Sequence, residues 1–465
     1  MEIIHFETLG CKLNQIETES IADAFSKAGF KPDLGRETSG DNQSDSAVYL
    51  PVGIPILSII NTCTVTGKAE QKARRLIRLL LRKYPASPVL VTGCYAEVEQ
   101  ASIAAIDPRV IVFPGSVKGA LAELPEFLLE RETRNPGEPV KAILESFCTR
   151  ARETDGQTSH TFALATDTFI AHSRASIKIQ DGCNNACSYC RIRLARGKSV
   201  SIDAAEAIER IRRIEIAGWK EVVLTGVNLS QYRSRGIDFA GLLARILDKT
   251  DSIAIRISSL YPERVNAELA PILTNPRIRP HFHLSVQSGS DRILESMRRP
   301  YRAQDVAQAV SILRTVKKNP FLACDIIAGY PGETDEDFEH TLTLCKTAEF
   351  AWIHAFPFSP RPGTEAWSMK PHIPERIATE RVARLTALAQ ENRRHYTESW
   401  IGKELAAIVE KKTGNGSIHI LTENYLEAEL LLPPGTATPE PHPGSEIRVQ
   451  LDSPGIARLS RTCAQ

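Results

Sequence analysis

The sequence predicts an α/β protein of three parts: an N-terminal open parallel α/β sheet, a central incomplete (βα)6 barrel of the TIM type, and a small C-terminal antiparallel β-barrel. Short apolar runs alternate with longer amphipathic patterns through residues 1–130 and again through 171–360, which is typical of parallel sheets. After about residue 399, short β segments separated by glycine and proline replace that alternation. The 465 residues are enough for several domains. We place their boundaries at 1–145, 146–170 for a connecting segment, 171–398 and 399–465.

The N-terminal part contains four expected strands, each followed by a helical pattern. The strands are expected at 3–8, 56–60, 89–92 and 110–113, and the first two helices at about 17–28 and 69–83. Residues 35–47, rich in Ser, Gly, Asp and Asn, predict a loop before the second strand. Residues 131–170 lack periodicity, so we expect an irregular connection to the central part.

Three cysteines of the N-terminal part, Cys11, Cys63 and Cys94, each come just after an expected strand. Because the carboxyl ends of parallel strands share one edge of a sheet, where ligands bind, these cysteines are expected to converge. The alternative is three unrelated buried thiols, since free cysteine is often a core residue. Three equivalent positions, two of them directly after a glycine, favour a site for a metal.

The central part contains six expected strands, at 176–180, 221–225, 253–258, 283–287, 323–328 and 354–358. Helical patterns lie between and after them, at about 203–217, 238–248, 263–273, 290–297, 303–317 and 334–348. Chemistry in such barrels takes place at the carboxyl ends of the strands. The groups expected there to contact a cofactor are Gly226, which allows close backbone approach, Asn228, Ser258 and Gln287. Each alone could equally be ordinary turn chemistry.

A loop after the first of these strands carries Cys183, Cys187 and Cys190 with the spacing C-x3-C-x2-C. This spacing is too tight for a disulfide framework, and it is one ligand short of a closed tetrahedral zinc site. Three thiolates suit a [4Fe–4S] cluster in which one iron stays open to a small molecule. Tyr189, next to the last cysteine, is expected to shield the cluster from water. The alternatives are a surface zinc loop or a group of reactive cysteines.

Composition and charge are those of an ordinary soluble globular protein. The formal net charge is +1, so a nucleic-acid site would have to be a local patch. No apolar run approaches the length of a membrane span, and clustered cysteines indicate reduced thiols. We therefore expect a cytoplasmic protein that does not bind a membrane. The remaining cysteines have no partners at ligand spacing and are interpreted as structural or incidental: Cys148, Cys324, Cys345 and Cys463.

Two segments are candidates for RNA binding. The expected helix at 69–83 is basic, although a solvated helix face is the simpler interpretation. A charged helix at 375–398 leads to the C-terminal module, whose strands are expected at 404–409, 418–421, 427–431 and 446–451. Small β-barrels of this size often bind RNA, and a plain capping domain is the alternative.

Several strings together resemble the methylthiotransferase family of radical S-adenosylmethionine (SAM) enzymes, over nearly the full length of the chain. The segments 8–15 (TLGCKLNQ), 61–66 (NTCTVT) and 93–96 (GCYA) look like its three N-terminal ligand motifs. The cysteine loop and the Ala-Arg-Gly at 195–197 look like the radical SAM motif. The segment 359–364 (SPRPGT) resembles the end of the barrel region, and Tyr425-Leu426 resembles the signature of the C-terminal TRAM domain.

The resemblance implies two [4Fe–4S] clusters. One would be held by Cys183, Cys187 and Cys190 and would cleave SAM. The other, an auxiliary cluster, would be held by Cys11, Cys63 and Cys94 and would carry the sulfur. A reducing electron donor such as flavodoxin or ferredoxin is implied as a partner. Radical chemistry of this kind belongs to the cofactor, and the protein orients and shields it.

The residues around Cys11 resemble the subgroup that methylthiolates carbon 2 of N6-threonylcarbamoyladenosine at position 37 of tRNA, using one SAM as methyl donor and one as radical source. The alternatives within the family are isopentenyladenosine in tRNA and an aspartate of a ribosomal protein. Outside it, the alternative is an iron–sulfur electron carrier or an RNA-binding scaffold. The chain departs from the family pattern at Arg193, where many relatives have proline, and in the segment 35–55, which is longer and more apolar than that pattern.

Overall fold

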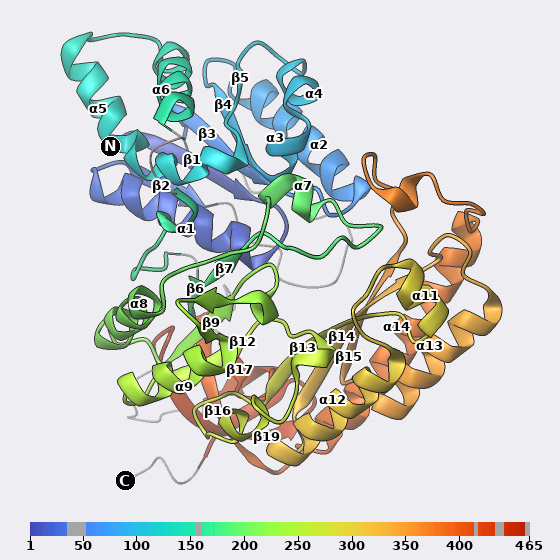
Figure 1. The fold of residues 1–465 in the computed structure, drawn as a ribbon. Helices are drawn as coiled ribbons and strands as arrows, with labels where there is room; N and C mark the ends of the chain where they lie inside the picture. The colour runs from blue at the N-terminus through green and yellow to red at the C-terminus, as the bar shows by residue number, and fades with distance from the viewer. Residues whose placement is uncertain (35–52, 155–159, 171, 413–416, 433–440, 461–465) are drawn as a thin grey trace. The chain divides into compact units, whose positions relative to one another are not determined.

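The computed structural model describes residues 1–34, 53–154, 160–170, 172–412, 417–432 and 441–460 (Figure 1). The expected loop at 35–47 and Cys463 lie outside the described residues. The chain forms two compact units, which are described separately. The first consists of Met1–Ala171, Asp181–Asn184 and Cys190–Ser199, and the second of His172–Gln180, Asn185–Tyr189 and Val200–Gln465.

The first unit is built on a five-stranded parallel sheet with the order β2-β1-β3-β4-β5. The two central strands β3 and β4 are buried along their whole length, as their apolar runs predict. The edge strand β2 was not expected, because its sequence Lys-Pro-Asp-Leu is polar and only partly buried. The strands are β1 (Ile3–Thr8), β2 (Lys31–Leu34), β3 (Leu57–Thr62), β4 (Val89–Gly93) and β5 (Val110–Val112).

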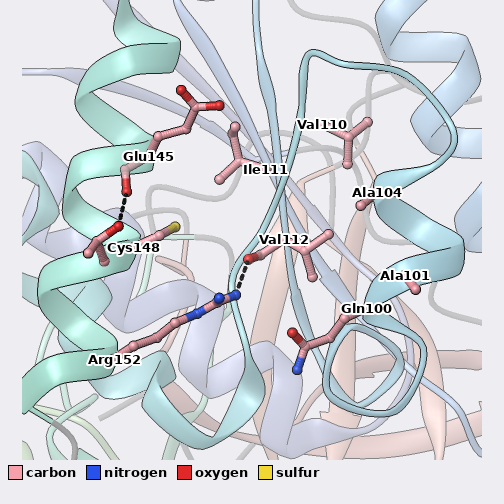
Figure 2. A pocket seen from close by; sticks show the side chains of 10 residues that line it. Gln100, Ala101, Ala104, Val110, Ile111, Val112, Glu145, Cys148 and Arg152 are labelled. Carbon is pink, nitrogen blue, oxygen red and sulfur yellow. Dashed lines mark hydrogen bonds between the residues drawn. The ribbon is translucent and has the colours of Figure 1, made fainter.

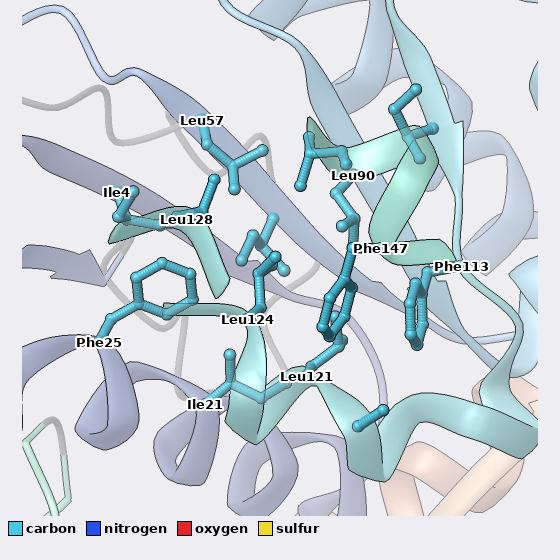
Figure 3. Packing of buried hydrophobic residues seen from close by; sticks show 14 of the residues in the cluster. Ile4, Ile21, Phe25, Leu57, Leu90, Phe113, Leu121, Leu124, Leu128 and Phe147 are labelled. Atoms are coloured by element: carbon cyan, nitrogen blue, oxygen red, sulfur yellow. The ribbon is translucent and has the colours of Figure 1, made fainter. Parts of the chain in front are cut away.

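Helices cover both faces of this sheet. On one face α1, α5 and α6 pack against the strands through a large apolar core, part of which Figure 3 shows around Phe25, Leu124 and Phe147. On the other face, Leu76, Ile77 and other apolar residues of α2 pack against β3 and β4. The helices are α1 (Lys12–Lys27), α2 (Gly67–Lys83), α3 (Cys94–Val98), α4 (Gln100–Ala104), the 3-10 helices η1 (Gly115–Glu123) and η2 (His160–Phe162), α5 (Leu124–Arg134), α6 (Val140–Thr154) and α7 (Ile192–Arg196).

The prediction that 131–170 is an irregular connection was wrong for much of its length. Residues Val140–Thr154 form the helix α6. Its apolar side chains Ile143, Leu144 and Phe147 are buried in the core of the first unit. The spacing of these three residues is that of one helix face, but arginines, glutamates and threonines around them obscured the pattern.

The second unit contains six parallel strands that follow one another in space in sequence order. They form two three-stranded sheets, β6-β9-β12 and β13-β14-β15. A parallel bridge between Leu260 and Leu284 continues the order from one sheet to the other. The expected incomplete (βα)6 barrel is therefore confirmed. The strands are β6 (Ala175–Lys178), β9 (Glu221–Thr225), β12 (Ala254–Ile257), β13 (His281–Gln287), β14 (Phe321–Ala328) and β15 (Trp352–Pro357).

Most helices of this barrel lie where the sequence predicts them. The exception is 263–273, where a 3-10 turn and one short helix replace a continuous helix. Pro271 is tolerated there because it lies in the first turn of that short helix. The helices are α8 (Ala204–Ile216), η3 (Leu229–Gln231), α9 (Phe239–Lys249), η4 (Pro262–Arg264), α10 (Ala270–Leu273), α11 (Asp291–Ser296), α12 (Ala303–Val316), α13 (Asp335–Ala348), η5 (Glu365–Trp367) and α14 (Glu375–Glu398), and the short strands are β7 (Gln180–Asp181), β8 (Val200–Ser201), β10 (Arg233–Ser234) and β11 (Ile237–Asp238). None of the helices in the described residues has an apolar stretch long enough to span a membrane.

The C-terminal part of the second unit is a closed five-stranded barrel with the order β16-β17-β18-β20-β19. The expectation of a purely antiparallel barrel needs correction, because β18 and β20 pair in parallel. The closing strand β20 was not expected, since it is only four residues long. The strands are β16 (Glu404–Lys412), β17 (Ile418–Thr422), β18 (Glu427–Leu431), β19 (Glu446–Ser453) and β20 (Ile456–Leu459).

A buried charge cluster joins this barrel to the amino-terminal end of the six-stranded barrel. The carboxylate of Glu221 on β9 accepts hydrogen bonds from Arg256 Nε (2.7 Å) and Arg279 Nε (2.9 Å). Arg279 also pairs with Glu446 on β19. Tyr425, in the turn between β17 and β18, stacks on His281 with ring centroids 4.0 Å apart. Because burial of Glu221 is outweighed by these arginines, its pKa falls to about 2.

Candidate active site

The strand order of the first unit decides where its cysteines lie. In a 2-1-3-4-5 sheet the direction of strand succession reverses between β1 and β3, and ligands bind at the carboxyl ends of those two strands. Cys11 directly precedes α1 after β1, and Cys63 directly follows β3. Cys94 begins α3 after β4. Cys11 is exposed, whereas the other two are buried.

Gly10 allows the turn after β1 to pass directly over Cys63. Its φ is +106°, and a Cβ at this position would lie 2.5 Å from Cys63 Cβ and 2.8 Å from Cys63 Sγ. Burial, together with the neighbouring thiols of Cys11 and Cys94, raises the pKa of Cys63 to about 12. The three cysteines are thus close enough to affect one another's ionisation.

Arg196, on α7, connects this cysteine group to two carboxylates. Its Nε donates to Cys94 Sγ at 3.2 Å, and its Nη1 donates to Asp181 Oδ2 at 2.9 Å and to Glu17 Oε1 at 3.2 Å. The side chain is only 7% exposed. Lys118 also pairs with Glu17, so the buried charges are compensated.

The arrangement of the side chains limits which metal group they could hold. Among the described residues, no three His, Cys, Asp or Glu side chains are arranged to hold a single metal ion. A [4Fe–4S] cluster does not require the three thiolates to meet at one ion, because each thiolate binds a different iron. Three neighbouring thiols, one of them exposed, with a buried arginine that donates to a sulfur, fit such a cluster.

The loop 181–199 contributes to both units. In the first unit, the Cys183 N–H donates to Gly197 O at 3.1 Å, and the Ile192 N–H lies 3.4 Å from Cys190 Sγ. Gly182 is required there, because its φ is +67° and a Cβ would lie 2.1 Å from Lys198 O.

In the second unit, Arg299 contacts two residues of the loop. Its Nη1 lies 3.3 Å from Cys187 Sγ and 3.4 Å from Tyr189 Oη. The guanidinium lies over the rings of Tyr261 and Tyr301, 4.5 and 4.8 Å from their centroids. Sequence reasoning missed Arg299, since a single arginine after a helix carries no signal of a role.

Four barrel residues were expected to contact a cofactor, and the structure gives them different surroundings. A Cβ on Gly226 would lie 2.9 Å from Gln180 Oε1, which accepts from the Asn228 N–H at 2.7 Å. The Asn228 side-chain oxygen accepts from Ser230 N–H and caps η3. Ser258 Oγ is buried and has no hydrogen-bond partner among the described residues. Gln287 has a φ of +67°, beside an irregularity in the pairing of β13.

Two histidines inside the six-stranded barrel, His283 and His354, were also missed. His283 Nε2 lies 3.1 Å from Asp325 Oδ1, and the ring of His354 lies 5.5 Å from that of His283. Although burial opposes it, pairing with His283 lowers the pKa of Asp325. Barrels of this type usually fill their interior with apolar layers. These partly exposed polar side chains therefore indicate room for a polar ligand.

A pocket of about 420 Å³ lies elsewhere, at the edge strand β5 of the first unit (Figure 2). It is lined by α4, β5 and α6, and none of the predicted site residues belongs to its wall. Cys148 lines it but is buried. Cys324 and Cys345 are also buried, in the second unit. The interpretation of these three thiols as structural stays a prediction.

Comparison with known proteins agrees with this arrangement. Residues 177–345 match the Radical SAM superfamily, and residues 52–115 match the uncharacterized protein family UPF0004. The solved radical S-adenosylmethionine methyltransferase TsrM of Kitasatospora setae, bound to cobalamin and a [4Fe–4S] cluster, aligns with 79% of this chain and 77% of its own (TM-score 0.50). At 14% identity, this likeness concerns the fold alone.

Curated relatives are similar over almost the whole chain. The threonylcarbamoyladenosine tRNA methylthiotransferase MtaB of Treponema pallidum is 47% identical, over 98% of this chain and 99% of the relative. The protein of the same name from Aquifex aeolicus is 34% identical, over 91% of this chain and 95% of the relative. The chain belongs to the family of threonylcarbamoyladenosine tRNA methylthiotransferases, which are radical SAM enzymes.

Proposed function

We propose that the chain methylthiolates carbon 2 of N6-threonylcarbamoyladenosine at position 37 of tRNA, beside the anticodon. One SAM would serve as methyl donor and a second as radical source. The observation that carries the proposal is the convergence of Cys11, Cys63 and Cys94 at the edge of the first-unit sheet, in a chain that also carries the C-x3-C-x2-C loop. A simple electron carrier usually holds each [4Fe–4S] cluster with four cysteines, whereas each set here has three and would leave one iron open.

The two sets of cysteines would hold different clusters. We assign Cys183, Cys187 and Cys190 to the cluster that binds SAM. Cys11, Cys63 and Cys94 are assigned to the auxiliary cluster. When bound, the clusters and SAM would together supply electron transfer, radical formation and the sulfur and methyl groups. Side chains cannot provide this chemistry for an unactivated aromatic C–H bond.

The chain's own residues would position and insulate these groups. Arg196 donates to Cys94 Sγ and is itself held by Asp181 and Glu17. Arg299 approaches Cys187 in the same way, fixed between two tyrosine rings. A positive charge and a hydrogen bond at a ligand sulfur favour the reduced state of a cluster.

For SAM, the proposed contacts are Tyr189, Gly226, Asn228, Ser258 and Gln287. The Ser258 hydroxyl supports this assignment best. A buried hydroxyl without a hydrogen-bond partner destabilises the fold, and a bound ligand would supply that hydrogen bond. The missing side chain of Gly226 would let a ligand approach the backbone closely. In this structure the side-chain oxygen of Asn228 caps η3 and its backbone N–H donates to Gln180 Oε1, so either group would have to exchange its partner to contact SAM.

The partners would be tRNA and a small reducing protein such as flavodoxin or ferredoxin. Along the chain, we assign the auxiliary cluster to residues 1–145 and the radical chemistry to 171–398. The closed β-barrel at 399–465 would be a TRAM-like RNA-binding module.

The test is mass spectrometry of tRNA nucleosides from cells that carry the wild-type gene, no gene, a Cys94→Ala variant or a Cys148→Ala variant. The proposal expects the 2-methylthio nucleoside with the wild type and with Cys148→Ala, which changes a buried thiol of no assigned role. It expects only the unmethylthiolated nucleoside with no gene and with Cys94→Ala. Activity that survives Cys94→Ala would refute the auxiliary site. A change confined to isopentenyladenosine, or to a ribosomal protein, would refute the substrate.

A further inference from the structure

The helix α2 presents a row of cations that the proposed chemistry does not use. We define the α2 stripe as its six exposed basic side chains: Lys68, Lys72, Arg75, Arg78, Arg82 and Lys83. At 3.6 residues per turn they fall within an arc of about 140° and extend over about 22 Å of the helix. The opposite side of the helix is apolar and packs into the core of the first unit through residues such as Ala73, Ile77 and Leu80.

Among the residues that the structure describes, no carboxylate pairs with any of the six side chains of the α2 stripe. The one acidic residue of the helix, Glu70, is buried and turned inward. It accepts a hydrogen bond from Thr64 Oγ1 at 2.5 Å and pairs with Arg191 at 3.2 Å. Glu70 therefore does not pair with the cations of the stripe.

Several exposed cations on other helices of the chain have a carboxylate partner. Lys27 pairs with Asp23 on α1, and Arg394 pairs with Glu398 on α14, both one helical turn apart. On α2 the residues one turn apart are cations instead, as in the steps from Lys68 to Lys72 and from Arg78 to Arg82. Such like-charge neighbours destabilise a helix. In a chain with a net charge of only +1, this concentration of charge forms a local positive patch that attracts an anionic partner.

The position of α2 indicates which partner that is. The helix starts at Gly67, four residues after Cys63, so one end of the α2 stripe lies next to the proposed auxiliary site. A partner that runs along the stripe from this end must be a polyanion with regularly repeated charges. We infer that the α2 stripe binds the phosphate backbone of the substrate tRNA. This inference rests on the proposed function, which supplies tRNA as the substrate.

The inference predicts a salt-dependent loss of affinity. Each lost phosphate contact lowers the slope of log K against log salt by about 0.7 to 0.9. The triple variant Lys72→Gln, Arg75→Gln, Arg82→Gln should therefore lower this slope by about 2 to 3 and weaken tRNA binding at least tenfold. The KM for tRNA should rise, whereas kcat at saturating tRNA should stay near the wild-type value.

The experiment uses the full chain with both clusters reconstituted, and tRNA that carries threonylcarbamoyladenosine without the methylthio group. Affinity is measured by fluorescence anisotropy over a range of salt concentrations. A matched control removes three exposed cations of α14 that already have carboxylate partners: Arg376, Arg384 and Arg394. Iron content and circular dichroism show whether each variant folds and holds its clusters.

The outcomes separate the inference from the proposed function. If the stripe variant loses affinity and slope while the control does not, the α2 stripe is a tRNA contact. If both variants lose the same amount, or neither loses any, the inference is wrong even though the wild type modifies tRNA. If the wild type does not modify this tRNA at all, the proposed function itself fails. A variant with a Lys72→Glu and Arg75→Glu reversal should bind more weakly still.

Discussion

Glu221 is the carboxylate on which the junction between the two barrels of the second unit depends. Its side chain is fully buried, and it accepts hydrogen bonds from Arg256 and Arg279. Glu221→Gln keeps the shape of the side chain but removes its charge. The two arginines would then stay buried without a full counter-charge, which is the costly way to break a buried ion pair.

Two routes give the size of the effect. A drop in pKa from 4.5 to about 2 corresponds to about 3 kcal/mol, at 1.36 kcal/mol per unit of pKa. Removing one partner of a buried ion pair typically costs about 3–5 kcal/mol. We therefore expect Glu221→Gln to lower the free energy of unfolding of the second unit by about 3–5 kcal/mol at pH 7. Because the folded pKa is lowered, this stabilisation is fully present above pH 4.5 and is lost as the pH falls toward 2.

Urea unfolding followed by tryptophan fluorescence measures this directly, because all four tryptophans lie in the second unit. The difference between wild type and variant should shrink as the pH falls from 4.5 toward 2. The double variant Glu221→Leu, Arg256→Met should cost less than Glu221→Gln, because no charge of that pair remains buried. A loss below about 1 kcal/mol for Glu221→Gln, or a difference that does not depend on pH in this range, would refute the reasoning.

Two further predictions concern the auxiliary site. Gly10→Ala should reduce the iron bound by the auxiliary cysteines, because the new Cβ would collide with Cys63; iron analysis of the reconstituted protein measures this. Arg196→Met should shift the midpoint potential of the auxiliary cluster to lower values, because it removes a positive charge and the hydrogen bond to Cys94. We expect at least a tenfold change in the ratio of reduced to oxidised cluster, which is about 59 mV for one electron. A redox titration followed by EPR measures this shift.

Each of these predictions has a matched control. Gly29 also has a positive φ, +91°, but a Cβ there would meet nothing within 4 Å. Gly29→Ala should therefore keep the iron, and equal losses in both variants would mean that backbone strain alone is responsible. Arg191 is as buried as Arg196 and pairs with two glutamates. If Arg191→Met moves the auxiliary potential as much as Arg196→Met, the sulfur contact is not the cause.

Much of the fold could be predicted from the sequence, because most elements bury one clear apolar face. Strands such as β3 and β4 are mostly apolar runs, and the apolar residues of α2 recur at helical spacing along one face. The missed elements lack such a signal. β2 is a polar edge strand and β20 is a four-residue closing strand, so only their neighbours in space define them. In α6 the apolar positions are masked by charged and polar residues between them.

The residues of the candidate site also fall into those that the sequence could predict and those that it could not. The three cysteines of the first unit could be found from their places after strands, because strand ends in a parallel sheet converge. The buried partners Arg196, Glu17 and Lys118 could not, since each is distant in sequence from the group that it contacts. Arg299 and His283 were missed for the same reason. A charged residue acquires its role only from what the fold places beside it.

The burial of three further thiols affects how the metal content of this protein can be interpreted. Cys148, Cys324 and Cys345 are almost completely shielded from solvent, and burial raises the pKa of Cys148 to about 11. Within the described residues, these three thiols therefore do not offer exposed ligands to added iron. In a purified sample, iron bound beyond what the six assigned cysteines can hold would have to involve Cys463, which lies outside the described residues, or molecules in which the buried thiols have become exposed.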